Sequence, residues 1–205
     1  LKYLKDSQIL LKIFQDTYDV LSNKEIEFIQ NMGVDGNYYY NFWQRRDPNL
    51  ITDINERLII HFQRLEYARD NYGEDSFTGY DDRGMIYVRY GEPDQKYIGN
   101  SILADVSDNE SWVYKISDKI ITFDFVQRGA TFSLIDDLSE VLRPGIGTNV
   151  LRTLKRVYEE RSHLDGPYTR MGTELSNIEV SRQHDLKIEN IAPHLARYRI
   201  EKEKT

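Results

Sequence analysis

The fold is decided in residues 78–94, which read TGYDDRGMIYVRYGEPD. Within this stretch Ile86, Val88 and Tyr90 alternate with Tyr87 and Arg89, and such alternation predicts a strand with one buried face. The last four letters, GEPD, are typical of a turn, because glycine and proline set the backbone angles that a turn needs. We therefore expect the chain to change here from helices to a sheet.

Helical patterns precede this stretch. Apolar residues recur near the helical period over residues 9–21. Ser22 and Glu25 have the spacing of a capping box and predict the start of a second helix. Apolar residues then step by three or four positions from Thr52, the expected N-cap, to about Tyr72. This last pattern predicts one long helix.

Strand patterns follow the stretch. Apolar residues alternate over residues 112–116, 121–125 and 130–134, with short turns between them, whereas residues 95–109 are polar and predict a loop. With the strand expected over residues 86–90, these segments predict an antiparallel meander of four strands. Because the helices come first and the strands later, the predicted class is α+β, with N-terminal helices packed on one face of a small four-stranded sheet.

The C-terminal part is expected to be a partly helical extension. Pro144 marks a break, so we predict a helix-plus-sheet domain over residues 1–143 and an extension over residues 144–205. An amphipathic helix is predicted from about Val150 to Tyr158, packed on the domain rather than lying on a membrane surface. After a second break at Gly166-Pro167 the periodicity is too weak to predict an element, and the charged end is expected to be a solvated tail.

Composition excludes several classes of function. The chain has 34 acidic and 27 basic residues and a net charge of -7, which argues against binding to nucleic acid through its phosphates. No segment approaches the run of about 20 apolar residues that spans a bilayer. The absence of cysteine excludes disulfides, thiolate nucleophiles and zinc-thiolate sites. Since the chain begins at Leu1 rather than Met, we expect a processed or trimmed piece, with any signal peptide or lipid attachment upstream.

An ordered set of motifs resembles the GWxTD-domain family, over residues from about 9 to about 135. The set consists of FWxxRDP at 42–48, NE at 55–56, DRG at 82–84, GxPD at 91–94 and WVY at 112–114. The naming motif differs, because TGYDD stands at 78–82 where Gly-Trp-x-Thr-Asp is expected. The resemblance implies a protein of the cell envelope of Bacteroidota or related bacteria, in the periplasm or at the outer membrane. Such proteins are often exported or lipid-anchored, and the domain has no established activity.

Polar residues of these motifs, together with one tryptophan, form the first candidate site. We predict that the polar residues make one network that ties the long helix to the first strand. The candidates are Trp43, Arg46, Asp47, Asn55, Glu56, Arg64, Asp82 and Arg83. They fit either structural contacts or a binding site. Structural ion pairs are the favoured interpretation, because exposed pairs are common and weak.

A cleft around Asp81 and Asp82 is the alternative site, with Tyr80 beside it. Glu92 and Asp94 could pair with Asp82 as acids of the glycosidase type, although their GEPD segment is more often only a turn. Two adjacent carboxylates could also bind calcium, but the loop lacks the spaced acidic series of known calcium loops. The histidines have no metal-ligand spacing, and no phosphate-binding or dinucleotide motif is present. We predict no cofactor, no metal site and no catalytic residue.

These observations favour a non-enzymatic structural or interaction protein of the cell envelope. Its expected role is that of an accessory subunit, which docks on a larger protein assembly through exposed aromatic residues and the C-terminal extension. The motivation is a set of 15 tyrosines without a recognisable catalytic group. The alternative is a hydrolase or a glycan-binding protein that uses the cleft around Asp81 and Asp82.

Overall fold

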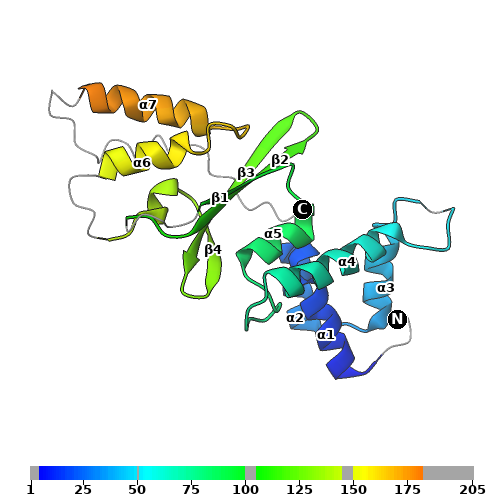
Figure 1. Ribbon diagram of the computed structural model, residues 1–205. Helices are drawn as coiled ribbons and strands as arrows, with labels where there is room; N and C mark the ends of the chain where they lie inside the picture. Colours follow the sequence, from blue (N-terminus) through cyan, green and yellow to red (C-terminus); the bar gives the residue numbers. More distant parts are fainter. Residues whose placement is uncertain (1–4, 50, 100–104, 145–149, 182–205) are drawn as a thin grey trace. The chain divides into compact units, whose positions relative to one another are not determined.

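The computed structural model describes residues 5–49, 51–99, 105–144 and 150–181 (Figure 1). The chain runs from helices to a sheet and back to helices, so the predicted α+β class is confirmed. The helical elements before the sheet are α1 (Ser7–Thr17), η1 (Tyr18–Val20), α2 (Asn23–Met32), α3 (Gly36–Gln44), α4 (Glu56–Asn71) and α5 (Asp82–Tyr90). The sheet and the elements after it are β1 (Gln95–Gly99), β2 (Asn109–Ile116), β3 (Lys119–Arg128), β4 (Thr131–Ile135), η2 (Leu138–Val141), α6 (Val150–Glu159) and α7 (Tyr168–Ser181).

Two compact units make up the chain, one that ends at Gly91 and one that begins at Glu92. The first unit contains α1 to α5 and the second contains the sheet with α6 and α7. The predicted packing of the N-terminal helices on the sheet stays a prediction, and so does the division into residues 1–143 and 144–205.

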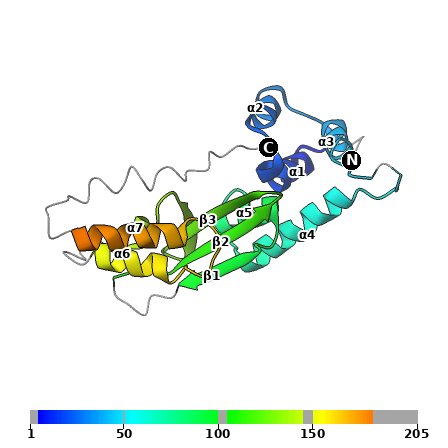
Figure 2. The same ribbon diagram turned by 90° about the horizontal axis from the view of Figure 1, so that it is seen from above.

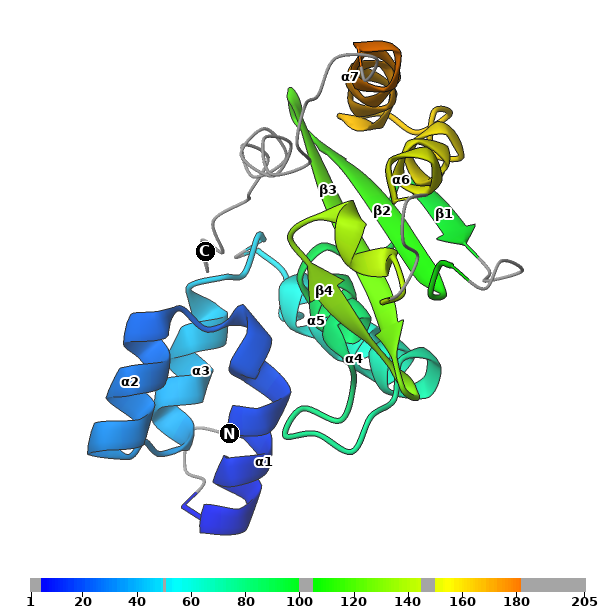
Figure 3. The ribbon, with the colours of Figure 1, turned by 90° about the vertical axis from the view of Figure 1, so that its left-hand side faces the viewer.

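The first unit has an aromatic core between its first helices. Figure 3 shows α1, α2 and α3 grouped together. Leu21, Ile29, Tyr39, Phe42 and Trp43 are all buried in one cluster there. The aromatic run that precedes Arg45 therefore faces inward at every third or fourth position of α3, as a helix with one buried side should.

Local capping chemistry sets where these helices begin. The predicted capping box is confirmed, because the Ser22 amide donates to Glu25 Oε2 at 2.8 Å and the Glu25 amide donates to Ser22 Oγ at 3.3 Å. The predicted start of the long helix at Thr52 is wrong. Asn55 is the N-cap of α4, since its Oδ1 accepts from the Leu58 amide at 2.9 Å. Asparagine and threonine are both good caps, and the loop decides between them.

The strand predicted over residues 86–90 is wrong, because these residues belong to the helix α5. Asp81 Oδ1 accepts from the Arg83 amide at 2.9 Å and from the Gly84 amide at 3.3 Å, and it thereby caps the helix. Ile86 and Val88 are only 2% and 1% exposed. Residues two apart lie on opposite sides of a helix, so a helix buried on both sides shows the same alternation as a strand.

Gly84 allows α5 to pack closely on the residue before its cap. A Cβ at this position would come within 2.6 Å of the Tyr80 ring. The helix is thus compatible only with glycine at its third residue unless Tyr80 moves. This close approach links the TGYDDRG motif to helical rather than extended structure.

The first strand of the sheet lies in a segment that was expected to be a loop. β1 occupies residues 95–99 and pairs antiparallel with β2, with Lys96 opposite Trp112. Its exposed positions carry Lys96 and Ile98, so it lacks a clear polar and apolar alternation. An edge strand pairs through its backbone on one side only, and its side-chain pattern is correspondingly weak.

The sheet is an antiparallel meander in the order β1-β2-β3-β4, as predicted (Figure 3). β2 and β3 form the central hairpin, with Trp112 opposite Phe123 and Tyr114 opposite Ile121. Ser117, at the turn between them, has a φ of 56°, which is the left-handed conformation that tight hairpin turns require.

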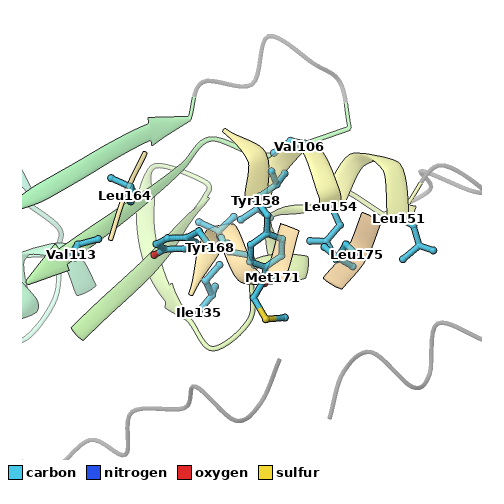
Figure 4. Close-up of a cluster of buried hydrophobic side chains, with 14 residues drawn as sticks. Val106, Val113, Ile135, Leu151, Leu154, Tyr158, Leu164, Tyr168, Met171 and Leu175 are labelled. Carbon is cyan, nitrogen blue, oxygen red and sulfur yellow. The ribbon is translucent and has the colours of Figure 1, made fainter. Parts of the chain in front are cut away.

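Helices α6 and α7 share a hydrophobic core with the sheet (Figure 4). Val113 of β2 and Ile135 of β4 meet Leu154, Tyr168 and other apolar residues of the two helices in this cluster. Figure 2 shows α6 and α7 side by side. The predicted helix near residue 150 is confirmed and it packs on the domain, whereas α7 was not predicted. The tail from residue 182 onward lies outside the described residues.

A buried arginine connects the helices to the sheet inside the second unit. Arg161 is fully buried, and its Nε donates to Ser111 Oγ at 2.6 Å while Nη1 donates to Val157 O at 2.6 Å. Nη2 donates to Asn109 Oδ1. Ser111 in turn donates to the carboxylate of Asp124, whose pKa is raised by burial. Every nitrogen of the guanidinium group thus has a partner, which is the condition for burying a charge.

We predict that Gly84→Ala lowers the free energy of unfolding by about 1–3 kcal/mol, because the added methyl group overlaps the Tyr80 ring. Gly172→Ala in α7 is the matched control, since its Cβ would be 3.6 Å from Tyr158 and would raise helix propensity. This control should gain up to about 1 kcal/mol. Chemical denaturation of both variants measures the two changes, and a neutral Gly84→Ala would contradict the close packing.

Arg161→Ala should destabilise the second unit by about 3–5 kcal/mol, because it leaves the Asp124 carboxylate buried without a nearby cation. Arg170→Ala removes a cation that is 71% exposed and should change stability by less than about 1 kcal/mol. The fluorescence of Trp112 during denaturation, in a Trp43→Phe background, reports on this unit. Equal effects of the two substitutions would show that the buried charge is not needed.

Candidate functional site

The connection between α4 and α5 is a loop that hydrogen bonds hold in place. The Asp81 amide donates to Tyr72 O at 2.8 Å, which closes the loop at its base. Ser76 Oγ donates to Tyr80 O at 3.1 Å and accepts from the Gly79 amide at 3.2 Å. Arg69 of α4 donates from Nη2 to Thr78 O at 3.2 Å. The loop is therefore held by hydrogen bonds within itself, at its base and to Arg69 of α4.

Asp81 serves as a cap and as an ion-pair partner at the same time. Its Oδ1 accepts from backbone amides of α5, and its Oδ2 accepts from Arg83 Nη2 at 2.7 Å and from Arg83 Nε at 3.1 Å. The side chain of Asp81 is only 2% exposed. Both oxygens of this carboxylate are engaged in holding the chain, so it does not offer a free acid or base to a substrate.

Tyr80 reaches across the first unit to Asp19 in η1. Its hydroxyl donates to Asp19 Oδ2 at 2.8 Å. Arg89 of α5 donates from Nε to Asp19 O at 2.8 Å and pairs with the Asp19 carboxylate at 3.5 Å. Burial, and next the Asp19 charge, raise the pKa of Tyr80, which keeps its hydroxyl protonated as a donor. These bonds join the loop and α5 to the first helix.

A second set of contacts ties α4 to the end of α1. Arg69 Nη2 donates to Asp16 Oδ1 at 2.6 Å. His61 Nε2 lies 2.7 Å from Asp16 O, and because a carbonyl only accepts, this nitrogen carries the proton. His61 Nδ1 is buried without a hydrogen-bond partner among the described residues. Burial lowers the pKa of His61 to about 4, and the Asp16 contact only partly opposes this.

The other predicted network residues make local contacts of their own. Arg46 donates from Nη2 to Glu25 Oε1 at 3.2 Å and lies 3.7 Å from the centre of the Phe42 ring. Asn55 donates to the carbonyl of Trp43 at 2.7 Å. These bonds hold the region between α3 and α4, whereas the predicted tie was to a strand. The segment that was predicted to be that strand forms the helix α5.

Of three further candidates, Asp47 and Glu56 bond close to their own position, whereas Arg64 bonds to a residue 25 positions away in α5. Asp47 accepts from the Asn49 amide at 3.0 Å, and Glu56 accepts from the Thr52 hydroxyl at 3.0 Å. Arg64 of α4 donates from Nη1 to Arg89 O at 3.0 Å, near the end of α5. Each contact fixes a loop or a helix end.

A pocket of about 460 Å³ opens beside the loop, entirely within the first unit. Its walls come from α1, η1, α2, the loop and the start of α5. The lining residues are Phe14, Tyr18, Asp19, Gln30, Glu74, Ser76, Phe77, Thr78, Tyr80, Asp81, Asp82 and Met85. This volume is in the range of sites for small ligands or single side chains.

The pocket brings together only part of the alternative cleft. Tyr80, Asp81 and Asp82 line it, but Glu92 and Asp94 do not. Asp94 Oδ2 instead accepts from the Lys115 amide at 2.6 Å, inside the second unit. Phe14, Tyr18 and Asp19 were not predicted, because their place in the pocket follows from how the end of the first helix packs on α5.

The described residues contain neither a metal-holding cluster nor a membrane-spanning helix. No group of three or more His, Cys, Asp or Glu side chains is arranged to hold a metal ion within the parts of the chain that the structure describes. Over the same residues, no helix combines the length and the apolar character that crossing a bilayer demands.

The fold and the pocket together define an α+β protein whose first unit carries a pocket lined by aromatic and acidic residues. The GWxTD-domain family model matches residues 10–136, which is more than half of the chain. The chain therefore belongs to the GWxTD-domain family, as its motifs indicated. No curated protein and no solved structure matches it significantly.

Acid should destabilise the first unit through His61. The unfolded histidine takes up a proton as the pH falls below 6.5, whereas the folded one resists protonation down to about 4. Stability is thus unaffected well above pH 6.5, is lost as the pH falls, and levels off below pH 4. Linkage predicts a loss of about 2 kcal/mol between pH 7 and pH 5.

His61→Gln isolates this contribution, because an amide can still donate to Asp16 O but does not titrate. We expect the difference in unfolding free energy between the natural chain and the variant to shift by about 2 kcal/mol over that range, in favour of the variant at pH 5. Denaturant titrations at each pH measure it. Parallel pH profiles for the two proteins would contradict the burial of a neutral imidazole.

Proposed function

We propose that this chain is a non-enzymatic interaction protein of the bacterial cell envelope, in the periplasm or at the outer membrane. In this role it is an accessory subunit that docks on a larger protein assembly. Membership of the GWxTD-domain family supports the envelope location through the occurrence of such proteins in Bacteroidota and related bacteria. The partner is a protein, since the acidic net charge of -7 disfavours nucleic acid.

The observation that carries this proposal is the engagement of two carboxylates of the pocket, those of Asp81 and Asp19. Asp81 caps α5 and pairs with Arg83, and Asp19 accepts from Tyr80 and pairs with Arg89. A general acid or base must reach the atom whose proton it transfers. Side chains held by internal bonds are suited to fixing the shape of a surface, and a fixed surface is what docking requires.

An apolar surface on α4 and the segment before it is suited to a protein partner. Ile54, Ile59 and Phe62 are 56%, 44% and 44% exposed, and Ile51 is 95% exposed. Ile59 and Phe62 are three positions apart in α4 and so lie on the same side of the helix, and apolar residues that share an exposed side mark interaction surfaces more often than single ones do.

Site-specific crosslinking in native envelopes tests the proposal. A photoreactive phenylalanine analogue at Phe62 should yield one defined crosslinked protein, and the chain should migrate with a larger assembly on native gels. The same analogue at Asp70, an exposed position of the same helix, is the control and should yield none. A chain that fractionates only as a monomer and crosslinks to nothing from Phe62 would refute docking.

A glycan-binding or hydrolytic function is the second candidate, because aromatic rings line the pocket beside Asp82. Aromatic faces and carboxylates are common in sugar sites. This function requires that Asp82→Ala abolishes sugar binding or turnover while the melting temperature stays unchanged. If the substitution only lowers the melting temperature, Asp82 has a structural role.

A further inference from the structure

We infer that the pocket of the first unit binds a lysine or arginine side chain presented by a peptide segment of a protein partner. The inference rests on the proposed docking function, since the partner supplies the peptide. It assigns the ligand to one chemical class, a cation carried on an aliphatic stem. The aromatic wall, the charge of the lining and the rigidity of the loop each support this class.

Three aromatic rings form one wall of the pocket. Phe77 of the loop contacts Tyr18 and Phe14 edge to face, with ring centres 5.4 Å and 5.9 Å apart, and Phe14 and Tyr18 are 5.7 Å apart. Phe77 is nevertheless 48% exposed. An aromatic cluster that leaves part of a ring in water offers a surface on which a cation or an aliphatic stem can lie.

The charge of the lining selects for a cation. Four carboxylates line the pocket, those of Asp19, Glu74, Asp81 and Asp82, and no Lys, Arg or His residue lines it. Arg89 offsets Asp19 and Arg83 offsets Asp81 from outside the lining. The exposed Glu74 carboxylate lies at the rim and adds negative charge where a ligand enters. An anionic ligand would meet repulsion here.

The wall is preformed, so a ligand would not have to order it. The Glu74 amide donates to Gly79 O at 3.3 Å across the loop, and Ser76 bonds to the backbone at both Gly79 and Tyr80. Phe77 lies between these anchors. A braced loop that holds an exposed ring in place lowers the entropic cost of binding.

The rim favours a peptide over a free amine. Exposed Gln30 and Glu74 carry polar side chains at the rim, and a peptide backbone beside the inserted side chain can bond to the Gln30 amide. Met85 and Phe77 provide apolar contact for the methylene stem of a lysine or arginine. A small amine would leave these rim contacts unused.

Titration of the full ¹⁵N-labelled chain with blocked pentapeptides tests the inference. The peptides are Ac-GGXGG-NH₂ with Lys, Arg, Gln or Glu at X, and amide shifts of the loop and the start of α5 are the readout. The Lys and Arg peptides should shift these amides with an affinity at least about five-fold higher than the Gln peptide, and the Glu peptide should not bind. Affinity for the Lys peptide should fall with rising salt.

Two matched pairs of variants locate the site. Phe77→Ala should weaken binding of the Arg peptide about three-fold or more, because exposed cation contacts to aromatic rings contribute modestly. Phe28→Ala removes a ring of equal exposure, 49%, outside the pocket and should leave the affinity unchanged. In the same way Glu74→Gln should weaken binding, whereas Glu27→Gln on α2 should not.

The outcomes separate this inference from the docking proposal. Equal binding of the Lys and Gln peptides, or full affinity in Phe77→Ala, overturns the inference while crosslinking from Phe62 still tests docking. Tight binding of free spermidine without binding of any peptide overturns the assignment to a protein partner. Binding of a neutral sugar at the same amides, without a response to the Lys peptide, also overturns it. Selective binding of the Lys or Arg peptides in a chain that crosslinks to no envelope protein would support the pocket chemistry and refute docking.

Discussion

The structure of the first unit depends on how the carboxylate of Asp81 is used. One of its oxygens accepts two backbone amides and starts α5, and the other binds Arg83. A carboxylate at a helix N-terminus satisfies amides that the helix leaves unpaired and interacts favourably with the helix dipole. This single side chain turns the TGYDDRG segment from a loop into the start of a helix. The position of Tyr80 immediately before it follows from the same arrangement.

Other polar residues of the first unit form hydrogen bonds and ion pairs between its helices. Tyr80 and Arg89 bind Asp19 in η1, and Arg69 and His61 bind Asp16 near the end of α1. These charged and polar side chains therefore connect helices to one another, whereas the sequence predicted that they connect helices to a strand. The same bonds brace the α4–α5 loop, and the braced loop leaves Phe77 at the edge of a pocket. One set of bonds thus both connects the helices and places Phe77 in the lining of the pocket.

In the second unit the polar contacts centre on one fully buried cation, the guanidinium group of Arg161. Arg161 is surrounded by Ser111, Asn109 and Val157, and Asp124 lies one hydrogen bond further along. Hydrogen bonds of this kind are directional, so they specify how α6 and α7 sit on the sheet in a way that apolar contacts alone would not. This provides a physical reason for the helical extension to belong to the sheet's own core.

Sequence by itself determined the features that neighbouring residues encode. The capping box of Ser22 and Glu25, the hairpin of β2 and β3 and the amphipathic helix α6 could all be read from local spacing. It also determined family membership, because the motifs occur in a fixed order. Alternation at Ile86 and Val88 misled the prediction, since a short helix buried on both sides has the same pattern as a strand.

Only the tertiary structure decided the pocket and the contacts around it. Tyr80 and Asp19 are 61 positions apart in the chain, and His61 and Asp16 are 45 positions apart. Nothing in the local spacing of either pair signals that they meet. Such contacts form when helices pack, and packing depends on the shapes of whole buried faces rather than on the residues next to each group. Phe77 and Glu74 became candidates for binding for the same reason.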